Sequence, residues 1–311
     1  MNNLPTQIRS QPVRLALGTA PLRGPVFDPQ PVDDALRTLQ HALDRGLNFI
    51  DTAPFYGDGE TETLIGQVLA GRPRNTFTLQ TKAGRLPHKI DDPRLDFSKA
   101  GIRRSLENSL KNLGVDFIDR VLIHDPDDFY REALDNALPV LHEFKQQGLI
   151  GAVGAGMNQW QMLADFARHG GFDCFLLAGR YTLLEQGASE LLTLCAEKEI
   201  EIMLGGVFNG GILATGAVPD AVYNYAAATP EILQKVQSMS AICARYGVPL
   251  ATAALRFAAF PQSVTALVVG LKSTEEVDAL LANWNLSIPA DLWLEMRAQG
   301  LISADAPLPN E

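Results

Sequence analysis

The sequence predicts a single (β/α)8 barrel of the α/β class, and three observations support this prediction. Short apolar runs of strand length alternate with longer amphipathic runs of helix length, eight of each. No Ser/Pro-rich linker interrupts the alternation. The length of 311 residues suits one such barrel. A doubly wound sheet is the alternative, but the first strand and its loop, LALGTAPLRGP, lack the G-x-G-x-x-G fingerprint usual in that fold.

The expected strands are short runs rich in Val, Ile, Leu and Phe, as buried parallel strands are. RVLIH and VTALVVG are examples. We expect the eight strands at residues 13–19, 47–52, 76–82, 120–124, 150–155, 174–180, 201–207 and 264–270.

The segments between the strands have helical periodicity and the start and stop residues of helices. DDALRTLQHALDRG places four apolar side chains on one face and ends at Gly46. SKAGIRRSLENSLKNLG begins at Ser98, a favourable N-cap, and ends at Gly114. We expect helices at residues 33–46, 60–70, 98–114, 131–148, 158–169, 188–198, 230–246 and 274–284.

We treat residues 1–311 as one barrel domain, in which residues 1–12 form an N-terminal extension expected to cap the barrel floor. The net charge of −10 disfavours nucleic acid and anionic membranes as partners. The N-terminus lacks the apolar core of a signal peptide. Cys174, Cys195 and Cys243 lie far apart and show no metal-ligand or disulfide spacing, so we expect a cytoplasmic protein without a metal. The sequence does not indicate an oligomeric state.

Polar side chains stand at the ends of three consecutive predicted strands. The second strand ends at Asp51, the third at Lys82 and the fourth at His124. Because the C-terminal ends of barrel strands meet at one face, where active sites lie, these three side chains should converge. Tyr56 follows Asp51 by five residues, so its phenol should lie one short loop above the second strand. Each residue alone is more often a cap or a packing residue, whereas the four together indicate a catalytic site.

These four residue types suit proton transfer. A phenol has a pKa of about 10, which is high for acid–base work near neutrality. A neighbouring ammonium stabilises phenolate and lowers that pKa, and a carboxylate keeps the ammonium charged in a partly buried mouth. We therefore predict that Tyr56 transfers the proton, that Lys82 tunes it, that Asp51 holds Lys82, and that His124 orients the substrate oxygen.

The segments GLNFIDTAPFYGDGETETLIG, LQTK and VLIHD resemble the aldo-keto reductase superfamily. The resemblance extends from LALGTAPL to LLANW, and the family's Asp–Tyr–Lys–His pattern falls on Asp51, Tyr56, Lys82 and His124. It implies hydride transfer with a nicotinamide cofactor that is bound, without a metal, across the barrel mouth.

The resemblance also implies cofactor contacts. The family's asparagine that holds the nicotinamide carboxamide falls on Asn158, but its usual serine, glutamine and stacking tyrosine are replaced by Met157, Ala178 and Gly205. The loop Gly206–Gly211 offers small residues and free backbone N–H groups for a pyrophosphate. The predicted cofactor-binding residues are Gly18, Thr19, Asp51, Asn158, Gly205, Gly206, Phe208, Gly210, Lys272, Ser273 and Glu276.

The last predicted loop bears on the choice of cofactor. Many relatives that prefer NADP have an arginine where this chain has Glu276. A carboxylate repels a 2′-phosphate and accepts a hydrogen bond from a free ribose hydroxyl, so NAD is the expected cofactor. Lys272 and Ser273 could bind a 2′-phosphate, so NADP stays an alternative cofactor. Glu275 and Glu276 could also be present for a structural reason, because acidic residues are favourable at a helix N-terminus.

The segments GAVGAGMNQW, LLAGRYTLLEQ and GGVFNGGIL are most similar to the aldose 1-dehydrogenase branch of the family, which includes L-fucose (D-threo-aldose) dehydrogenases. The resemblance implies oxidation of a cyclic hemiacetal carbon to a lactone. Three alternatives remain. They are pyridoxal 4-dehydrogenase, a general NADPH-dependent aldehyde or ketone reductase, and a non-enzymatic cofactor-binding regulatory subunit.

Overall fold

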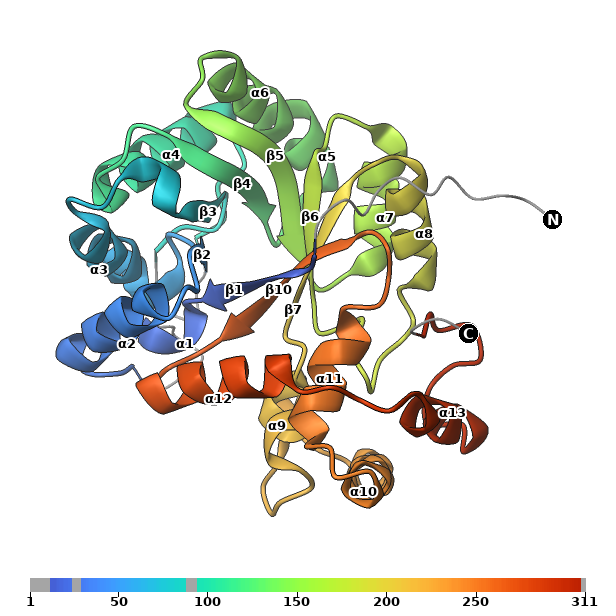
Figure 1. The fold of residues 1–311 in the computed structure, drawn as a ribbon. Helices are drawn as coiled ribbons and strands as arrows, with labels where there is room; N and C mark the ends of the chain where they lie inside the picture. The colour runs from blue at the N-terminus through green and yellow to red at the C-terminus, as the bar shows by residue number, and fades with distance from the viewer. Residues whose placement is uncertain (1–11, 24–28, 88–93, 309–311) are drawn as a thin grey trace.

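In the computed structural model, which describes residues 12–23, 29–87 and 94–308, eight parallel strands close into a barrel (Figure 1). Neighbouring strands follow the order β1-β10-β7-β6-β5-β4-β3-β2, and β2 pairs with β1. Their bounds are β1 (Arg14–Gly18), β2 (Phe49–Asp51), β3 (Thr78–Ala83), β4 (Ile118–His124), β5 (Ile150–Met157), β6 (Cys174–Ala178), β7 (Glu201–Gly205) and β10 (Val264–Gly270). The predicted fold class is confirmed, and each expected strand is present. The predicted cap of the barrel floor falls, apart from Pro12, outside the described residues.

A ring of helices surrounds the barrel, and it includes all eight predicted helices. The predicted helix at 131–148 consists of α5, a π-helical turn (Ala133–Ala137) and α6, and Pro139 at the start of α6 lacks an N–H for the regular ladder. The described helices before residue 230 are α1 (Ala20–Arg23), α2 (Val32–Asp44), α3 (Glu60–Leu69), α4 (Lys99–Leu113), α5 (Tyr130–Glu132), α6 (Leu138–Gln146), α7 (Trp160–His169), α8 (Ser189–Glu197) and α9 (Ile212–Thr215).

Two helices near the C-terminal end of the chain were not predicted. Helix α11 (Leu250–Ala258) packs against β10, between α10 (Pro230–Arg245) and α12 (Thr274–Asn285). Its sequence, LATAALRFA, is largely buried and carries a single charged residue, Arg256, so its polar face is narrow. The predicted helix at 230–246 is α10, which lies at the periphery beside the second unpredicted helix, α13 (Ala290–Ala298) (Figure 1).

A small hairpin between β7 and β10 was also missed. Strands β8 (Val222–Tyr223) and β9 (Ala226–Ala227) pair antiparallel. Two-residue strands are too short for the alternation that identifies a strand in sequence. The turn residues Asn224 and Tyr225 both have positive φ, 46° and 71°. Such a turn matches the twist of a hairpin but is unfavourable for a tyrosine.

The inside of the barrel is packed from the floor upward. At the end where the strands begin, the guanidinium groups of Arg14 and Arg120 lie 5.0 and 5.3 Å from the ring centroid of Phe49, and Arg120 pairs with Glu201 at 2.7 Å. Above them lies an apolar cluster of strand residues: Ala16, Phe49, Leu122, Cys174, Leu176, Met203, Ala266 and Val268. This packing leaves room for a ligand at the C-terminal ends of the strands.

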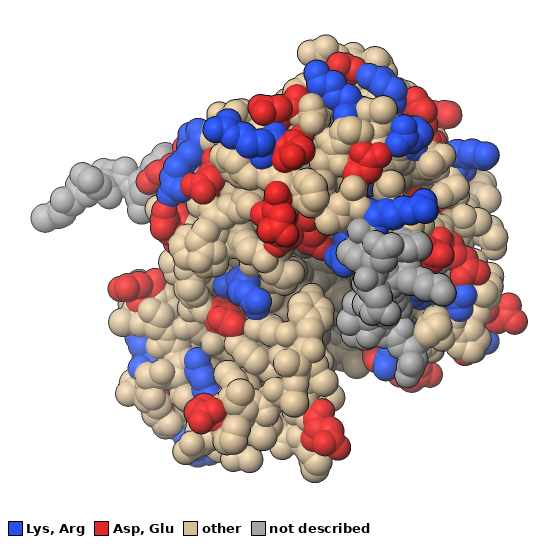
Figure 2. All heavy atoms as spheres, turned by 180° about the vertical axis from the view of Figure 1, so that it is seen from behind, with Lys and Arg blue, Asp and Glu red and all other residues tan. Residues whose placement is uncertain are grey.

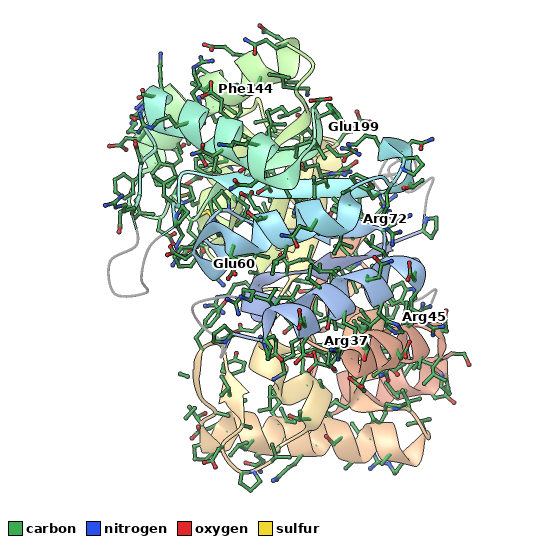
Figure 3. All side chains as sticks on the ribbon, turned by 90° about the vertical axis from the view of Figure 1, so that its left-hand side faces the viewer. Arg37, Arg45, Glu60, Arg72, Phe144 and Glu199 are labelled. Carbon is green, nitrogen blue, oxygen red and sulfur yellow. The ribbon has the colours of Figure 1, made fainter. Side chains whose placement is uncertain are left out.

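Helix α3 fixes the loop that carries Tyr56. The helix begins directly after the 3-10 turn Tyr56–Gly59, and Figure 3 shows Glu60 and Arg72 toward its two ends. Glu60 accepts a hydrogen bond from Arg23 Nε at 2.9 Å, which ties the start of α3 to the loop after β1. None of the described helices is both long and apolar enough to cross a lipid bilayer.

Candidate active site

A buried ion pair joins the ends of β2 and β3. The ammonium of Lys82 donates to both carboxylate oxygens of Asp51 at 2.9 Å and to the carbonyl oxygen of Thr52 at 2.9 Å. The side chains of Lys82 and Asp51 are only 2% and 5% exposed. Gln80 also donates to Asp51, at 2.7 Å. The predicted partnership of Asp51 and Lys82 is therefore present, with the charges fully paired inside the barrel.

Tyr56 lies above this pair. Its hydroxyl is 3.2 Å from Lys82 Nζ, and Lys82 also lies 4.8 Å from the centroid of the Tyr56 ring. The 3-10 turn that begins at Tyr56 is sharp, since Gly57 and Asp58 both have positive φ. At Gly57 a Cβ would lie 2.6 Å from the Cβ of Arg23. A residue with a side chain would therefore displace the turn that aims the phenol at Lys82.

His124, at the end of β4, completes the four predicted residues. Its ring contacts those of Phe55 and Tyr56 edge to face, with centroids 6.3 and 5.9 Å apart. His124 is 5% exposed, and its buried Nδ1 has no hydrogen-bond partner in the described part of the chain. Burial lowers the pKa of His124 well below its ordinary 6.5, and the positive charges of Lys82 and Arg85 act in the same direction. The imidazole is therefore neutral at physiological pH and offers one N–H donor.

The pKa of Tyr56 departs from the prediction made from the sequence. Burial raises the pKa of Tyr56 to about 12, and the lowering effect of Lys82 only partly opposes it. Burial also acts to lower the pKa of Lys82, but Asp51 and Tyr56 together raise it above its ordinary 10.5. The expectation that Lys82 brings the phenol below its free value was wrong for this pocket, because desolvation outweighs the neighbouring charge. Tyr56 is held as a neutral phenol hydrogen-bonded to an ammonium, which suits donation of a proton.

A pocket of about 330 Å³ opens above these groups. Seen from behind, the molecular surface is hollowed near its middle (Figure 2), and acidic and basic side chains are interspersed over it. Three of the four predicted catalytic residues line the pocket, while Asp51 supports it from beneath. The lining residues are Ala20, Phe55, Tyr56, Lys82, Arg85, His124, Asp125, Gly156, Met157, Asn158, Leu176, Ala178 and Tyr225.

Asn158 provides the test of whether a nicotinamide fits this pocket. It lies in the pocket wall, and its Nδ2 donates to the carbonyl of Ala178 at 2.8 Å. Its Oδ1 has no partner among the residues that the structure describes. A side-chain amide with one atom anchored and the other available suits a carboxamide, which presents both a donor and an acceptor. The residues present therefore fit the nicotinamide end of the cofactor.

The other predicted cofactor residues at this end are placed differently. Thr19 is fully buried and donates both its N–H and its hydroxyl to the Asp51 carbonyl, at 3.0 and 2.9 Å. Gly18 lies in the β1 ladder beside Asp51 and Gly270. None of Gly18, Thr19 and Asp51 lines the pocket. The contacts of Thr19 tie β1 to β2, Gly18 lies in the ladder of β1 with β2 and β10, and the Asp51 side chain holds Lys82 on β3.

The loop after β7 offers fewer free backbone donors than the sequence predicted. Gly205, Gly206, Phe208 and Gly210 lie at the C-terminal end of β7, outside the pocket lining. Within the loop Gly206–Gly211, the N–H of residue 209 donates to Gly206 and that of Gly211 donates to Phe208. Two of the N–H groups predicted to be free for a pyrophosphate are therefore engaged in the loop's own turns.

Lys272, Ser273 and Glu276 form the start of α12. The Ser273 hydroxyl accepts from the Glu276 N–H at 3.2 Å, and Glu276 Oε2 accepts from the Lys272 N–H at 2.8 Å. This reciprocal arrangement is close to a capping box. One oxygen of Glu276 therefore has a structural role, which is the alternative that the sequence left open.

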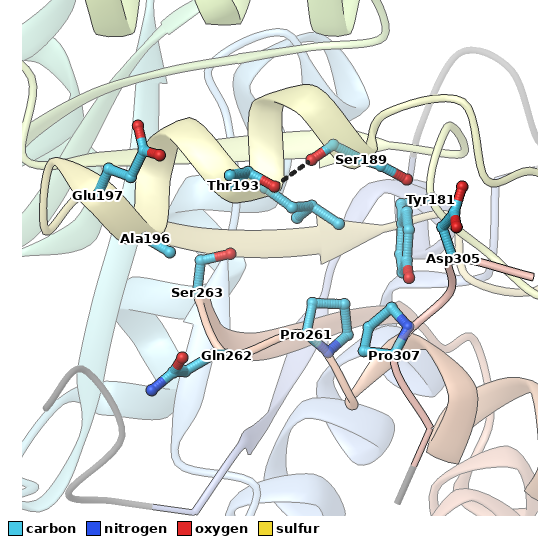
Figure 4. A pocket seen from close by; sticks show the side chains of 11 residues that line it. Tyr181, Ser189, Thr193, Ala196, Glu197, Pro261, Gln262, Ser263, Asp305 and Pro307 are labelled. Atoms are coloured by element: carbon cyan, nitrogen blue, oxygen red, sulfur yellow. Dashed lines mark hydrogen bonds between the residues drawn. The ribbon is translucent and has the colours of Figure 1, made fainter. Parts of the chain in front are cut away.

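A second hollow, of about 370 Å³, lies between α8 and the segments before β10 and after α13 (Figure 4). The hydroxyls of Tyr181 and Ser263 in its wall are buried without partners. Among the described lining residues, the charged ones are Glu197 and Asp305, and none is a basic group beside an acid or a phenol. It lacks the constellation that proton transfer needs, and the mouth of the barrel is the candidate active site. Among the described residues, no three His, Cys, Asp or Glu side chains group as metal ligands.

Three polar residues of the pocket were not singled out from the sequence, although the loop HDPDDFYREA, which contains Asp125, was expected on the substrate side. Arg85 and Asp125 follow Lys82 and His124 by three residues and one residue, so their place near the strand ends was visible in the sequence. The alternation of a regular strand, however, would point Asp125 away from the pocket. Arg85 lies 3.9 Å above the Phe55 ring. Tyr225, 68% exposed at the tip of the β8–β9 hairpin, reaches the pocket from a strand pair that the sequence did not reveal.

Known proteins similar to this chain are oxidoreductases. The model of the aldo/keto reductase family matches residues 14–299. Pyridoxal 4-dehydrogenase from Microbacterium luteolum is 33% identical over 93% of this chain and 94% of its own length. D-threo-aldose 1-dehydrogenase from a Pseudomonas species is 36% identical over 87% of this chain and 89% of its own length.

Solved structures agree on the fold. The glycerol dehydrogenase of Gluconobacter oxydans superposes with a TM-score of 0.76 at 23% identity, and the match covers 99% of this chain and 97% of that one. An aldo-keto reductase from Bacillus halodurans gives 0.75 at 22% identity, over 94% and 93% of the two chains. At this identity the likeness concerns the barrel alone.

We predict that Lys82→Met destabilises the protein by about 3–5 kcal/mol, because it leaves the Asp51 carboxylate buried without its counter-charge. Urea unfolding measures the change. The matched control is Arg103→Met, which breaks the Arg103–Glu143 pair on the surface, where the two side chains are 41% and 50% exposed. It should cost less than about 1 kcal/mol. Equal effects of the two substitutions would contradict the burial argument.

We also predict an acid-sensitive contribution from His124. The pKa of His124 is lowered in the folded state. Below about pH 6.5 the imidazole therefore binds a proton in the unfolded chain but not in the folded chain, which favours unfolding. This contribution to stability is complete above pH 6.5 and is lost as the pH falls. Between pH 7.5 and 5.5, the wild type should lose about 1 kcal/mol more unfolding free energy than His124→Gln. Exposed His169→Gln is the control and should behave as the wild type.

Proposed function

This chain belongs to the aldo/keto reductase family, and on that premise we propose that it is a nicotinamide-dependent dehydrogenase that oxidises the hemiacetal carbon of an aldose to a lactone. The observation that carries the proposal is the Tyr56 hydroxyl, 3.2 Å from the paired ammonium of Lys82 in the wall of a pocket. The polar side of that pocket, with Arg85 and Asp125, suits a substrate rich in hydroxyl groups.

Each residue of the pocket has its own role in the proposed reaction. Tyr56 Oη exchanges the proton with the reacting oxygen of the substrate: it donates in the direction of reduction and, when deprotonated, accepts from the anomeric hydroxyl in oxidation. Lys82 favours the deprotonated form, and Asp51 keeps Lys82 charged. Neutral His124 donates a hydrogen bond to the same substrate oxygen and orients it. A bound nicotinamide cofactor would accept or supply the hydride, and Asn158 would hold its carboxamide.

NAD is the proposed cofactor for the oxidation. The support is Glu276, whose second carboxylate oxygen remains available after Oε2 has accepted from Lys272. A carboxylate at this position favours a free ribose hydroxyl over a phosphate. The exposed ammonium of Lys272 would attract a 2′-phosphate and so favour NADP. The rates with NAD and with NADP therefore have to be compared directly.

Pyridoxal is the second candidate substrate. The similarity to a pyridoxal 4-dehydrogenase covers 93% of this chain, and the aromatic side chains of Phe55, Tyr56 and Tyr225 line the pocket. Aromatic side chains suit the flat face of a pyridine ring. Pyridoxal, like an aldose, forms a cyclic hemiacetal, so the same proton transfer at Tyr56 would serve it.

A substrate screen tests the proposal. We expect reduction of NAD with L-fucose, D-arabinose or L-galactose, a lactone as the product, and a lower rate with NADP. A rate with pyridoxal alone would replace the first candidate by the second. Activity confined to reduction of simple aldehydes with NADPH would indicate a general reductase. Cofactor binding without turnover of any substrate would indicate a regulatory subunit.

We predict that Tyr56→Phe retains cofactor binding but loses at least about a hundredfold in kcat, since only the proton-transferring oxygen is removed. Lys82→Met acts through the same oxygen, so the double variant should be little worse than either single one. Because burial raises the pKa of Tyr56 to about 12, the oxidation rate of the wild type should still be rising at pH 10. Near-normal turnover of Tyr56→Phe at saturating substrate would remove the proton-transfer role, and a plateau well below pH 10 would contradict the raised pKa.

A further inference from the structure

We propose that Arg85 and Asp125 form a pair that binds a substrate hydroxyl beside the reacting carbon, and that this pair selects polyhydroxylated sugars over simple aldehydes. The inference rests on the proposed function, because it concerns the same pocket. Both residues line that pocket, and they follow the strand ends that carry Lys82 and His124.

The backbone at Asp125 is the first observation. His124 faces the pocket, so in a regular strand the next side chain would point to the opposite face. The Asp125 N–H still continues the ladder, donating to the Gly156 carbonyl at 3.0 Å, but its φ is +45°. A residue with a side chain rarely adopts this conformation, and such strain is characteristic of functional sites. Its effect here is that two consecutive residues, His124 and Asp125, both line the pocket.

The pairing of the two charges is the second observation. Arg85 Nη1 donates to Asp125 Oδ2 at 2.5 Å, and the same oxygen lies 3.6 Å from His124 Nε2. The guanidinium is stacked 3.9 Å from the Phe55 ring, so its plane is held in place. The side chains of Arg85 and Asp125 remain 26% and 25% exposed. The pair is thus rigid and open to the pocket at the same time.

The hydrogen-bonding capacity that remains is the third observation. Among the described residues, neither Asp125 Oδ1 nor the other nitrogens of Arg85 has a partner. A hydroxyl can donate to a carboxylate and accept from a guanidinium at once, so the two groups together offer what one sugar hydroxyl needs. An aldehyde without a neighbouring hydroxyl would leave both unsatisfied, which disfavours its binding.

A purely structural pair in the same barrel has different contacts. Arg74 uses all three guanidinium nitrogens: Nε and Nη2 donate to the Phe117 carbonyl, Nη1 to that of Phe77, and Nη2 also to Asp119. Asp119 Oδ2 accepts a further bond from the Leu79 N–H. Arg74 and Asp119 hold strand ends together and leave no nitrogen for a ligand. Arg85, with its single described hydrogen bond, does not follow this pattern.

The experiment compares two substrates in each variant. We measure kcat/KM for oxidation of the aldose that the wild type prefers and for reduction of benzaldehyde, which has no hydroxyl. Asp125→Asn should lower the ratio of the two values by about 10- to 100-fold, the loss expected for one hydrogen bond to a charged group. Arg85→Lys, which keeps the charge but loses the planar fork, should lower the ratio in the same direction. Asp127→Asn removes a neighbouring carboxylate outside the pocket lining and should leave the ratio unchanged.

The outcomes separate this inference from the proposed function. If the wild type oxidises an aldose but Asp125→Asn and Arg85→Lys leave the ratio of the two kcat/KM values unchanged, our inference is overturned. Equal losses of kcat/KM for both substrates would mean that the pair supports the fold or His124. If the wild type oxidises no aldose, the proposed function is wrong, and the inference that rests on it is wrong too. Should Asp125→Asn not fold, as judged by circular dichroism, Arg85→Lys alone decides by the same ratio.

Discussion

The Asp51–Lys82 ion pair is the interaction on which the rest of the site depends. Two opposite charges, both almost fully buried, are stable inside a protein only when they face each other closely and their remaining hydrogen bonds are satisfied. Here the geometry comes from two adjacent parallel strands, in which Asp51 is paired in register with Gln80, two residues before Lys82. The three N–H donors of the ammonium are shared among the Asp51 carboxylate, the carbonyl of Thr52 and the hydroxyl of Tyr56. Pairing of these two strands brings the atoms together, so the fold and the site are stabilised by the same contacts.

The buried ammonium then sets the protonation of its neighbours. Its charge helps to keep His124 neutral, and it partly offsets the desolvation that raises the pKa of Tyr56. The result is a phenol and an imidazole that are both uncharged donors, above a fixed positive charge. A carbonyl or hemiacetal oxygen gains negative charge as it reacts, and donors fixed in advance around that oxygen favour the charged arrangement. The same electrostatics would serve reduction and oxidation, which differ in the proton on Tyr56.

The sequence predicted the barrel, its eight strands and four polar side chains of the pocket. Tyr56, Lys82 and His124 followed from strand-end pattern, and Asn158 followed from the family resemblance. The sequence-based predictions failed where a property depends on competing physical effects or on an irregular backbone conformation. The pKa of Tyr56 is decided by burial against charge, and burial is a tertiary quantity. Asp125 enters the pocket through a positive φ that no pattern announces, and Tyr225 enters it through a two-residue hairpin. One carboxylate oxygen of Glu276 caps the start of α12, and the predicted cofactor contact would use the other oxygen. The sequence does not show which of these two roles the residue has.

The position of the proposed recognition pair has a physical rationale. In a sugar, the carbon next to the reacting carbon also bears a hydroxyl, so groups that bind this hydroxyl must lie beside those that handle the reacting oxygen. Residues that directly follow catalytic strand ends meet this requirement, because the backbone fixes their separation and a misplacement of about 1 Å can cost a hundredfold in rate. A strained φ costs on the order of 1–3 kcal/mol, which is small beside such losses. On this argument, the strain at Asp125 is maintained because the alternative, recognition from a longer loop such as that of Tyr225, would hold the sugar less accurately.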